Sequence, residues 1–245
     1  MIGDIMQRAA RNNAAWCDAV CRAHGRPGEF TDVLWFNRQE TPRFYPDVVT
    51  TEGARAGTAQ LDTLDALMAA NSRPDWAVKD SFSALDLSSR GFRILFDAQW
   101  IYREPFAPPR EPELDGLRWI QVVDAAALRA WEQALTSGPG ADDREGSPIF
   151  MPPLLASEGI ALFAAERAGT IVGGGALSKA AGAVGVSNVF GAVPERTGVW
   201  HGLLVQAGRL YPATPVVGYE HGADLEIACN AGFDPIGPLR VWARP

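Results

Sequence analysis

Apolar and polar positions in the second half of the chain follow the two-residue period of strands. Val184, Val186 and Phe190 alternate with small or polar residues, so an extended segment there has one apolar face. Ala168-Gly169 separates two apolar runs, which is typical of a β-hairpin turn. The pattern predicts strands over residues 160–167, 170–178, 184–191, 215–220 and 239–243.

Helical periodicity fills the intervals between these strands. Leu128, Trp131 and Leu135 share one face at helical spacing, and Asp124 precedes them as an N-cap residue would. Asp224 is expected to cap a second, short helix in the same way. The predicted helices cover residues 124–135, 198–211 and 224–230.

The first half of the chain repeats part of this order. Its pattern predicts a strand, a helix, a strand, a short helix and a strand over residues 47–51, 58–71, 76–81, 82–89 and 92–102. Both halves end in a Gly-Phe pair, followed by a tryptophan nine or ten positions after the glycine and then by an arginine. We therefore expect a weak internal duplication. The matched residues are Gly91, Phe92, Trp100 and Arg103, and Gly232, Phe233, Trp242 and Arg244.

Four prolines mark the seam between the halves. Pro105, Pro108, Pro109 and Pro112 are incompatible with a helix interior or a central strand. We expect an extended linker over residues 104–116, between an N-terminal half, 1–103, and a C-terminal domain, 117–245. The predicted fold class is α/β (α+β): a mixed twisted sheet flanked by helices, built from two tandem related halves.

Composition narrows the function classes. Hydrophobic residues make up 47% and charged residues 21%, as in globular proteins, and no apolar run approaches the ~20 residues that span a membrane. The formal net charge of −7 argues against non-specific binding to nucleic acid. The N-terminal residues show no signal-peptide pattern, and three cysteines make no disulfide framework, so we expect a cytoplasmic protein. The pattern implies no particular oligomeric state.

Three segments of the second half carry a family resemblance. The run 160–177 holds a hairpin whose second strand opens with Ile-Val-Gly, the run 193–196 reads Val-Pro-Glu-Arg, and the run 231–233 reads Ala-Gly-Phe. In this order, over residues 160–242, they resemble the central hairpin, the strand-to-helix corner and the terminal Gly-Phe of the GCN5-related N-acetyltransferase (GNAT) family.

The resemblance implies a splayed sheet that holds acetyl-CoA beside its fourth strand. It also implies an N-acetyltransferase that moves the acetyl group to the amine of a small molecule or peptide, with no metal. Backbone N–H groups at the start of the following helix would bind the pyrophosphate, because a helix N-terminus attracts anions. The residues that the resemblance assigns to acetyl-CoA are Val189, Phe190, Gly191, Arg196, Thr197, Gly198, Val199 and Gly202.

Two positions depart from the family pattern. The family has Arg or Gln, two residues, Gly, one residue, and then Gly or Ala, whereas Arg196 is followed by Val199 and His201. Many members also have a tyrosine that reprotonates the CoA thiolate, and Ala228 stands in its place. The alternative hypothesis is therefore a catalytically inactive GNAT-fold protein that serves as a binding or scaffold module.

The best acid–base group of the second half follows a predicted strand and consists of Tyr219, Glu220 and His221. A glutamate held there can accept a proton from an ammonium substrate, so that the free amine attacks. We assign Glu220, with Tyr219 beside it, as the candidate catalytic residues. The same residues also suit a solvated turn before a helix, and this alternative stays open.

Three further clusters have a structural and a functional interpretation. Cys17, Cys21 and His24 share a helical face, which suits zinc or a buried packing face. The aromatic segment 35–45 also carries arginines, and it suits a substrate or partner surface, or core aromatics with arginines that reach solvent. The glycines 173–175 open a strand rather than a helix, so they predict a bulge or close packing instead of a phosphate loop.

Overall fold

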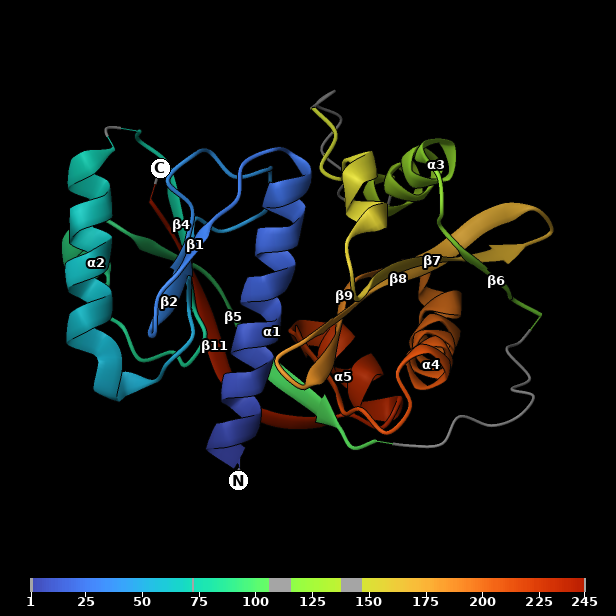
Figure 1. Ribbon diagram of the computed structural model, residues 1–245. Coiled ribbons are helices and arrows are strands. Elements are labelled where there is room, and N and C mark those ends of the chain that lie inside the picture. The colour runs from blue at the N-terminus through green and yellow to red at the C-terminus, as the bar shows by residue number, and fades with distance from the viewer. Residues whose placement is uncertain (1, 72, 106–115, 138–146, 245) are drawn as a thin grey trace.

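The computed structural model describes residues 2–71, 73–105, 116–137 and 147–244. Within them, eleven strands form one continuous mixed sheet and five α-helices cover its faces (Figure 1). The α/β architecture expected from the sequence is confirmed. Residues 106–115 of the expected linker lie outside the described residues, and the domain boundaries stay a prediction. No helix of the described part is both long and apolar enough to cross a membrane.

The elements divide between the two halves. The N-terminal half contributes α1 (Ile2–Ala23), α2 (Gly57–Ala70), β1 (Glu29–Phe30), β2 (Leu34–Phe36), β3 (Val48–Thr50), β4 (Trp76–Asp80) and β5 (Arg93–Arg103). The C-terminal half contributes α3 (Ala125–Thr136), α4 (Val193–Leu210), α5 (Gly222–Asn230), β6 (Arg118–Gln121), β7 (Ile160–Arg167), β8 (Thr170–Ala180), β9 (Ala183–Gly191), β10 (Val216–Glu220) and β11 (Asp234–Arg244).

A predicted capping residue marks the start of one of the three helices of the second half. Asp124 caps α3 as predicted, because its carboxylate accepts the backbone N–H groups of the first turn. α4 begins at Val193, earlier than predicted, since Pro194 has a helical φ and needs no N–H in the first turn. The predicted cap of α5 is wrong: His221 is its N-cap, and Asp224 lies in the first turn.

The short helix expected over residues 82–89 is not formed. The Asp80 carboxylate accepts the backbone N–H groups of Phe82, at 3.3 Å, and Leu85, at 2.7 Å. These bonds hold the segment in a loop, and only a 3-10 turn, Ser88–Arg90, follows. Local side-chain bonds of this kind compete with helix formation.

The halves exchange their terminal strands. The order across the sheet is β1-β2-β3-β4-β11-β5-β10-β9-β8-β7-β6. β5 ends the first half but pairs with β10 of the second, and β11 ends the second half but pairs with β4 of the first. β5 and β11 also pair with each other, antiparallel, at the centre of the sheet. The two halves therefore share one sheet.

Sheet register supports the internal duplication. β5 and β11 have the same length and nearly the same sequence of buried and exposed positions. Arg103 lies opposite Val216, the first residue of β10, and Arg244 lies opposite Trp76, the first residue of β4. The two tandem related halves are thus confirmed.

The two tryptophans of the sequence match do not correspond in the sheet, because their registers differ by one position. Trp100 lies opposite Tyr219, the fourth residue of β10, whereas Trp242 lies opposite Val78, the third residue of β4. The two tryptophans consequently point to opposite faces of the sheet, because side chains alternate along a strand. Gly91 and Gly232 do correspond, and both have a left-handed backbone, with φ of 81° and 90°.

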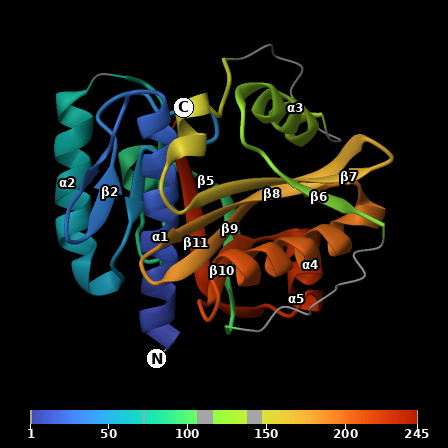
Figure 2. The ribbon, with the colours of Figure 1, turned by 45° about the vertical axis from the view of Figure 1, so that its right-hand side comes forward.

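Helices cover both faces of the sheet. Trp100 and Val241 pack beneath α1, Ile101 packs against α4 and α5, and Trp242 packs against α2. α1 and α3 therefore share one face, and α2, α4 and α5 lie on the other. α1 crosses the middle of the molecule, where the halves meet (Figures 1 and 2).

A buried asparagine fixes α1 to the second half. The side-chain amide of Asn12 donates to the carbonyl oxygens of Ser178, Ala180 and Ala183, at 2.9 to 3.1 Å. Gly185 makes this approach possible, because a Cβ there would overlap the Asn12 amide oxygen. The position of α1 over the sheet is thus set by specific hydrogen bonds as well as by apolar packing.

The triple glycine of β8 allows close packing, as predicted. A Cβ at Gly173 would overlap Val199 of α4, and a Cβ at Gly175 would lie 2.6 Å from Leu203. The register between β8 and β9 also shifts between Gly174 and Ala176, which marks the expected bulge.

Gly202 gives α4 its close approach to β6. A Cβ at this position would overlap the indole of Trp119. We expect Gly202→Ala to lower the free energy of unfolding by about 1–3 kcal/mol, the usual cost of overpacking, which exceeds the gain in helix propensity. Denaturant unfolding measures the change.

The matched control is Gly3→Ala in α1. A Cβ at Gly3 meets nothing within 4 Å, so this variant should be neutral or slightly stabilised. Equal stability of the two variants would contradict the packing role of Gly202.

Candidate active site

Strands β9 and β10 begin as a parallel pair and then separate. They pair at Val184 with Val216 and at Gly185 with Val217. Further along β9, Asn188 has a left-handed backbone, with φ of 52°, next to the bulge. A pocket of about 250 Å³ lies between the separated strand ends, and we call it the β9–β10 pocket.

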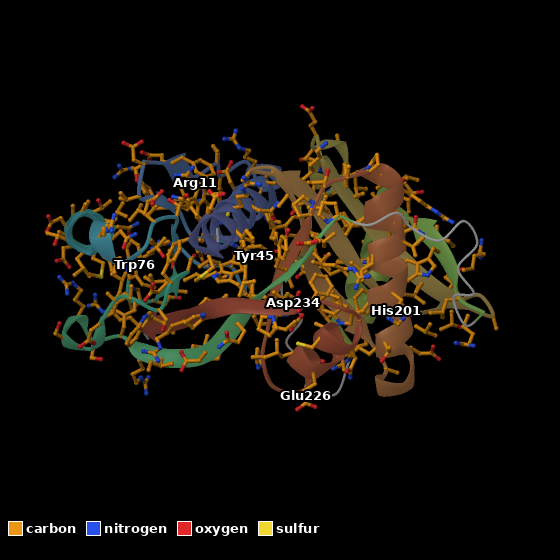
Figure 3. All side chains as sticks on the ribbon, turned by 90° about the horizontal axis from the view of Figure 1, so that it is seen from below. Arg11, Tyr45, Trp76, His201, Glu226 and Asp234 are labelled. Atoms are coloured by element: carbon orange, nitrogen blue, oxygen red, sulfur yellow. The ribbon has the colours of Figure 1, made fainter. Side chains whose placement is uncertain are left out.

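Both halves of the chain line the β9–β10 pocket. Residues 186–189 of β9 and residues 219–221 at the end of β10 come from the second half. Trp16 of α1 and Lys79 of β4 come from the first half, together with Tyr45. Figure 3 shows Tyr45 near the middle of the molecule, between Trp76 of the first half and His201 of the second.

Glu220 ends β10 and carries a strongly perturbed carboxyl. Burial raises the pKa of Glu220 to about 8, and repulsion by Asp224 adds to the rise. Arg196 and the backbone N–H of His221 oppose it. The Glu220 carboxyl is therefore mostly protonated at neutral pH and becomes a base as the pH rises through about 8. His221 itself is exposed and stacks on Phe96, with ring centroids 5.2 Å apart.

Tyr219 is held by a buried lysine from the other half. The Lys79 ammonium donates to the Tyr219 hydroxyl oxygen at 3.1 Å and to the Asn13 side-chain oxygen at 2.8 Å. Burial opposes the charge of Lys79, yet the facing Tyr219 and Cys17 hold the pKa of its ammonium above the ordinary value. Lys79 is thus a buried cation beside a phenol. Because Lys79 fills one acceptor position, the Tyr219 O–H is free to donate elsewhere.

The end of β9 places three of the residues assigned to acetyl-CoA. Val189 lines the β9–β10 pocket. Phe190 instead packs edge-on against Trp131, with centroids 5.4 Å apart. Gly191 ends the strand, and its carbonyl oxygen accepts a hydrogen bond from Nε of Arg196 at 3.2 Å.

The remaining five assigned residues lie along α4. Arg196 forms an ion pair with Asp224 of α5. Thr197 is exposed and Gly198 is half-buried, whereas the side chain of Val199 is buried in the core. Gly202, packed on Trp119, faces away from the first turn of the helix.

The first turn of α4 offers few free N–H groups to an anion. Pro194 has none, and those of Glu195 and Arg196 bond to the Ala192 carbonyl at 2.9 and 3.1 Å. The Glu195 carboxylate adds negative charge and pairs with Arg167 at 2.8 Å. This corner therefore offers a pyrophosphate fewer donors than a helix N-terminus with free N–H groups would.

Ala228, which replaces the family's tyrosine, is fully buried in the core against α4 and the sheet. It supplies no acid. Tyr219 and Tyr45 are the tyrosines of the pocket lining, and Tyr219 is the one that a lysine contacts.

Lys79 and Asn13 were not predicted from the sequence as site residues. Lys79 follows the apolar start of its strand, Trp76-Ala77-Val78, and a lysine in this place is a recognisable signal of a buried polar group. Its partner Tyr219 is 140 residues away, and only the exchange of strands brings the two together.

The corresponding place in the first half is closed. Asp80 matches Glu220 in register, but its carboxylate is used by the backbone of the following loop. The buried Gln60 side chain donates to the carbonyl oxygens of Glu52, at 2.7 Å, and Val33, at 3.1 Å, beside the end of β3. The first half thus keeps the strands and fills the space between their ends with hydrogen bonds.

The cysteine face of α1 is a packing face. Cys17 and Cys21 are buried, and burial raises the pKa of the Cys21 thiol to about 12. His24 bonds to the Ile149 carbonyl at 2.8 Å. Among the described residues, no cluster of His, Cys, Asp and Glu has the geometry of a metal site.

Comparisons with known proteins place the fold. No family model and no curated protein matches the sequence. The GCN5-related N-acetyltransferase from Kribbella flavida is similar with a TM-score of 0.65 and 19% identity, over 97% of this chain and 95% of that one. A tandem GNAT protein from the clavulanic acid biosynthesis pathway is similar with a TM-score of 0.56 and 13% identity, over 99% and 94%.

A third solved structure agrees. The GCN5-related N-acetyltransferase from Sphaerobacter thermophilus has a TM-score of 0.53 and 16% identity, over 98% of this chain and 94% of that one. The chain therefore has the fold of the GCN5-related N-acetyltransferases, with two halves in tandem.

Proposed function

We propose that this protein is an N-acetyltransferase that moves the acetyl group of acetyl-CoA to an amine in the β9–β10 pocket. The observation that carries the proposal is Glu220, a carboxyl at the point where two strands separate, with a pKa of about 8. A group that titrates near neutral pH at such a place suits proton transfer. The GNAT fold supports an acyltransferase in general.

Glu220 is the base of the proposed reaction. In its ionised form it accepts a proton from the ammonium of the acceptor, directly or through water. The free amine then attacks the thioester carbonyl carbon, and a C–N bond forms. The attacking nitrogen loses its second proton to water as the intermediate collapses to the amide.

Tyr219 is the acid of the proposed reaction. As the C–S bond breaks, the phenol gives its proton to the departing thiolate, and the Lys79 ammonium, 3.1 Å away, stabilises the phenolate that is left. Tyr219 thereby takes the role that Ala228 leaves empty. Proton transfer back through solvent restores both groups.

Acetyl-CoA is proposed to enter along β9. Val189 and Gly191 would align the pantetheine beside the pocket, with Phe190 packed behind them. Arg196, with Thr197 and Gly198 at the exposed start of α4, would meet the pyrophosphate. Val199 and Gly202 would contribute only the helix on which these groups stand, because both pack inward.

A binding or scaffold module without acetyl transfer is the second candidate. The specific observation in its favour is the start of α4, where Pro194 lacks an N–H and Arg196 is already paired with Asp224. Binding of acetyl-CoA separates the two candidates.

A thermal shift measures that binding. Acetyl-CoA at about 100-fold above its Kd should stabilise the fold by ~2.7 kcal/mol, a rise in Tm of about 5–10 °C for a chain of this size. Arg196→Gln should reduce the shift, and Arg209→Gln, at the other end of α4, should not. Absence of a shift with millimolar acetyl-CoA or CoA would favour the scaffold.

The pH dependence of turnover reports the base. Glu220 acts only when ionised, so kcat/KM should rise with pH and bend near pH 8. Glu220→Gln should lower kcat/KM by about 10²-fold or more and remove that bend, which leaves only the ionisation of the substrate amine.

Asp224→Asn tests the cause of the perturbed pKa. It removes the repulsion that raises the Glu220 pKa and leaves Arg196 without its carboxylate partner, and both changes favour the ionised form. The bend should therefore move to lower pH. A bend that stays in place, or moves upward, contradicts the assignment.

The acid role of Tyr219 is tested by the leaving group. Tyr219→Phe should lower kcat with acetyl-CoA by about 10²-fold with little change in KM, because the lost proton transfer belongs to the transition state. The loss should shrink with an aryl thioacetate, whose more acidic thiol departs without a proton.

Lys79 acts through Tyr219, so its variants should follow the same trend. Lys79→Met should lower kcat with acetyl-CoA, and Lys79→Arg should restore part of it by keeping the cation. A loss that is equal for both thioesters would point to a structural role.

A further inference from the structure

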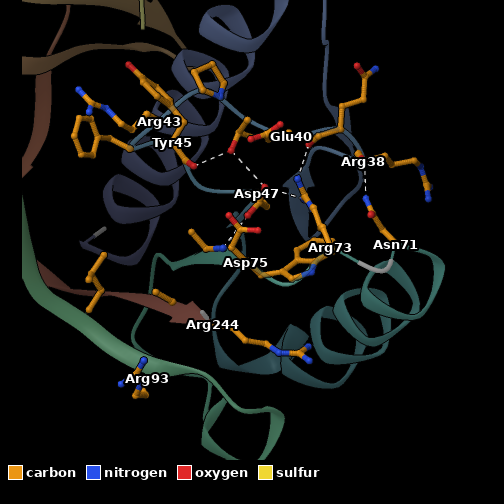
Figure 4. A pocket seen from close by; sticks show the side chains of 18 of the residues that line it. Arg38, Glu40, Arg43, Tyr45, Asp47, Asn71, Arg73, Asp75, Arg93 and Arg244 are labelled. Carbon is orange, nitrogen blue, oxygen red and sulfur yellow. Dashed lines mark hydrogen bonds and ion pairs between the residues drawn. The ribbon is translucent and has the colours of Figure 1, made fainter. Parts of the chain in front are cut away.

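A second and larger hollow adjoins the β9–β10 pocket. It has a volume of about 1250 Å³ and lies between the segment 38–47 and the ends of β5 and β11 (Figure 4). The aromatic residues of the segment 35–45 belong partly to the core and partly to the surface. Trp35 and Phe36 belong to the core, whereas Phe44 is exposed on the wall of the hollow.

The residues that line the hollow carry a net positive charge, whereas the chain as a whole is negative. Five arginines line it and three carboxylates face them, in a protein whose formal net charge is −7. One of the arginines, Arg38, is paired with Glu29 outside the hollow at 2.6 Å, so four further arginines stand against the three carboxylates. A concave surface of net positive charge attracts anions. The arginines are Arg38, Arg43, Arg73, Arg93 and Arg244, and the carboxylates belong to Glu40, Asp47 and Asp75. We call it the arginine hollow.

Arg73 builds one wall of the arginine hollow. Its guanidinium pairs with Asp47 at 2.8 Å and donates to the Gln39 carbonyl at 2.9 Å. It also stacks over Trp76, 4.2 Å from the ring centroid. These contacts use the charge of Arg73 to hold the segment 38–47 in place.

Arg93 of β5 and Arg244 of β11 also line the hollow, well apart from each other in Figure 4. Arg93 is paired with Ala243, so the side chains of Arg93 and Arg244 leave the sheet on opposite faces. Arg93 is exposed and pairs with no carboxylate among the described residues. Arg244 contacts the Met68 sulfur of α2 at 3.4 Å and pairs with no carboxylate in the part of the chain that the structure describes. The exposed guanidinium of Arg93 suits a carboxylate or a phosphate, which accept hydrogen bonds from arginine in pairs.

The arginine hollow and the β9–β10 pocket share their walls. Phe44 and Tyr45 line both. Along β5, Leu95 lines the hollow and Phe96, the next residue, lines the pocket. Phe44 and Leu95 are 74% and 63% exposed, so an apolar surface open to a ligand separates the arginines from the pocket.

We propose that the acceptor is an amine with a carboxylate or phosphate at its far end. This inference rests on the proposed function for the position of the amine, which lies at Glu220. The ligand then runs as an apolar chain across Phe44 and Leu95, and its anionic end reaches Arg93. Each part of the ligand meets a surface of matching chemistry.

The phosphates of acetyl-CoA are the competing occupant. The resemblance places them at the start of α4, which lies beyond β9 in the second half, whereas the wall of the arginine hollow is built by first-half residues and the end of β11. The experiment below separates the two.

Matched probes test the inference. ω-Aminohexyl phosphate and ω-aminohexanol differ only in the phosphate, and ω-aminohexanoate and its amide differ only in the carboxylate. Titration calorimetry measures their binding to the wild-type chain, and release of CoA thiol with mass spectrometry of the product measures their acetylation. Each anionic probe should bind at least about tenfold more tightly than its neutral partner, the effect of one charge-assisted hydrogen bond. The comparison between the two pairs shows which anion is preferred.

Variants locate the effect. Arg93→Gln/Arg244→Gln should abolish the preference for the anionic probes, and Arg209→Gln/Arg240→Gln, which removes the same charge outside the hollow, should keep it. Circular dichroism checks folding, and the exposed Arg93→Gln alone replaces the double variant if that variant unfolds. It should reduce the preference.

Three results would overturn the inference. They are equal binding of the anionic and neutral probes, a preference that survives in the hollow variants, and a hollow variant that weakens acetyl-CoA binding but not probe binding. Failure of the proposed function looks different: no acetylated product forms and acetyl-CoA gives no thermal shift, whatever the probes do in calorimetry.

Discussion

The exchange of terminal strands is the constraint on which the rest of the structure depends. β5 of the first half pairs with β10 of the second, and β11 of the second half pairs with β4 of the first. Each of the two central strands therefore pairs with a strand of the other half, and the two also pair with each other. Neither half has a complete sheet of its own. The same exchange sets β4 and β10 antiparallel on either side of the centre, and α1 spans the face above them. Lys79 from one half and Tyr219 from the other meet there, and the candidate active site exists only in the joined molecule.

The duplicated strands also show how the halves have diverged. Lys79 and Tyr219 are the fourth residues of β4 and β10, and they approach each other across the centre from equivalent positions. The fifth residues, Asp80 and Glu220, differ in the surroundings of their carboxyl groups. The Asp80 carboxylate is consumed by backbone N–H groups, whereas Glu220 stands at an open pocket and has a raised pKa. One half therefore supplies structure and a cation, and the other supplies the proposed acid and base.

Local patterns in the sequence predicted the local features of the fold. The hairpin around Ala168-Gly169 and the cap of α3 follow from nearest neighbours along the chain, and both are confirmed. The order of strands in the sheet could not be obtained in this way, because nothing in the sequence of β5 or β11 states which strand lies beside it. Glu220 was recognised from its place after a strand. Lys79, the partner of the neighbouring Tyr219, was not, since the proximity of Lys79 and Tyr219 depends on that order. The helix expected over residues 82–89 was wrong for a different reason, because one carboxylate, Asp80, outcompetes a weak helical pattern.

The place of β11 at the centre of the sheet has a consequence for synthesis. Every other described strand is made before β11, so β4 and β5 leave the ribosome with unpaired edges that face each other across a missing strand. Open edges of this kind recruit strands from other chains. A nascent chain must keep that gap until its last strand arrives, and during this interval a neighbouring copy can insert its own β11. The feature that joins the two halves is thus also the point at which two molecules are most easily entangled.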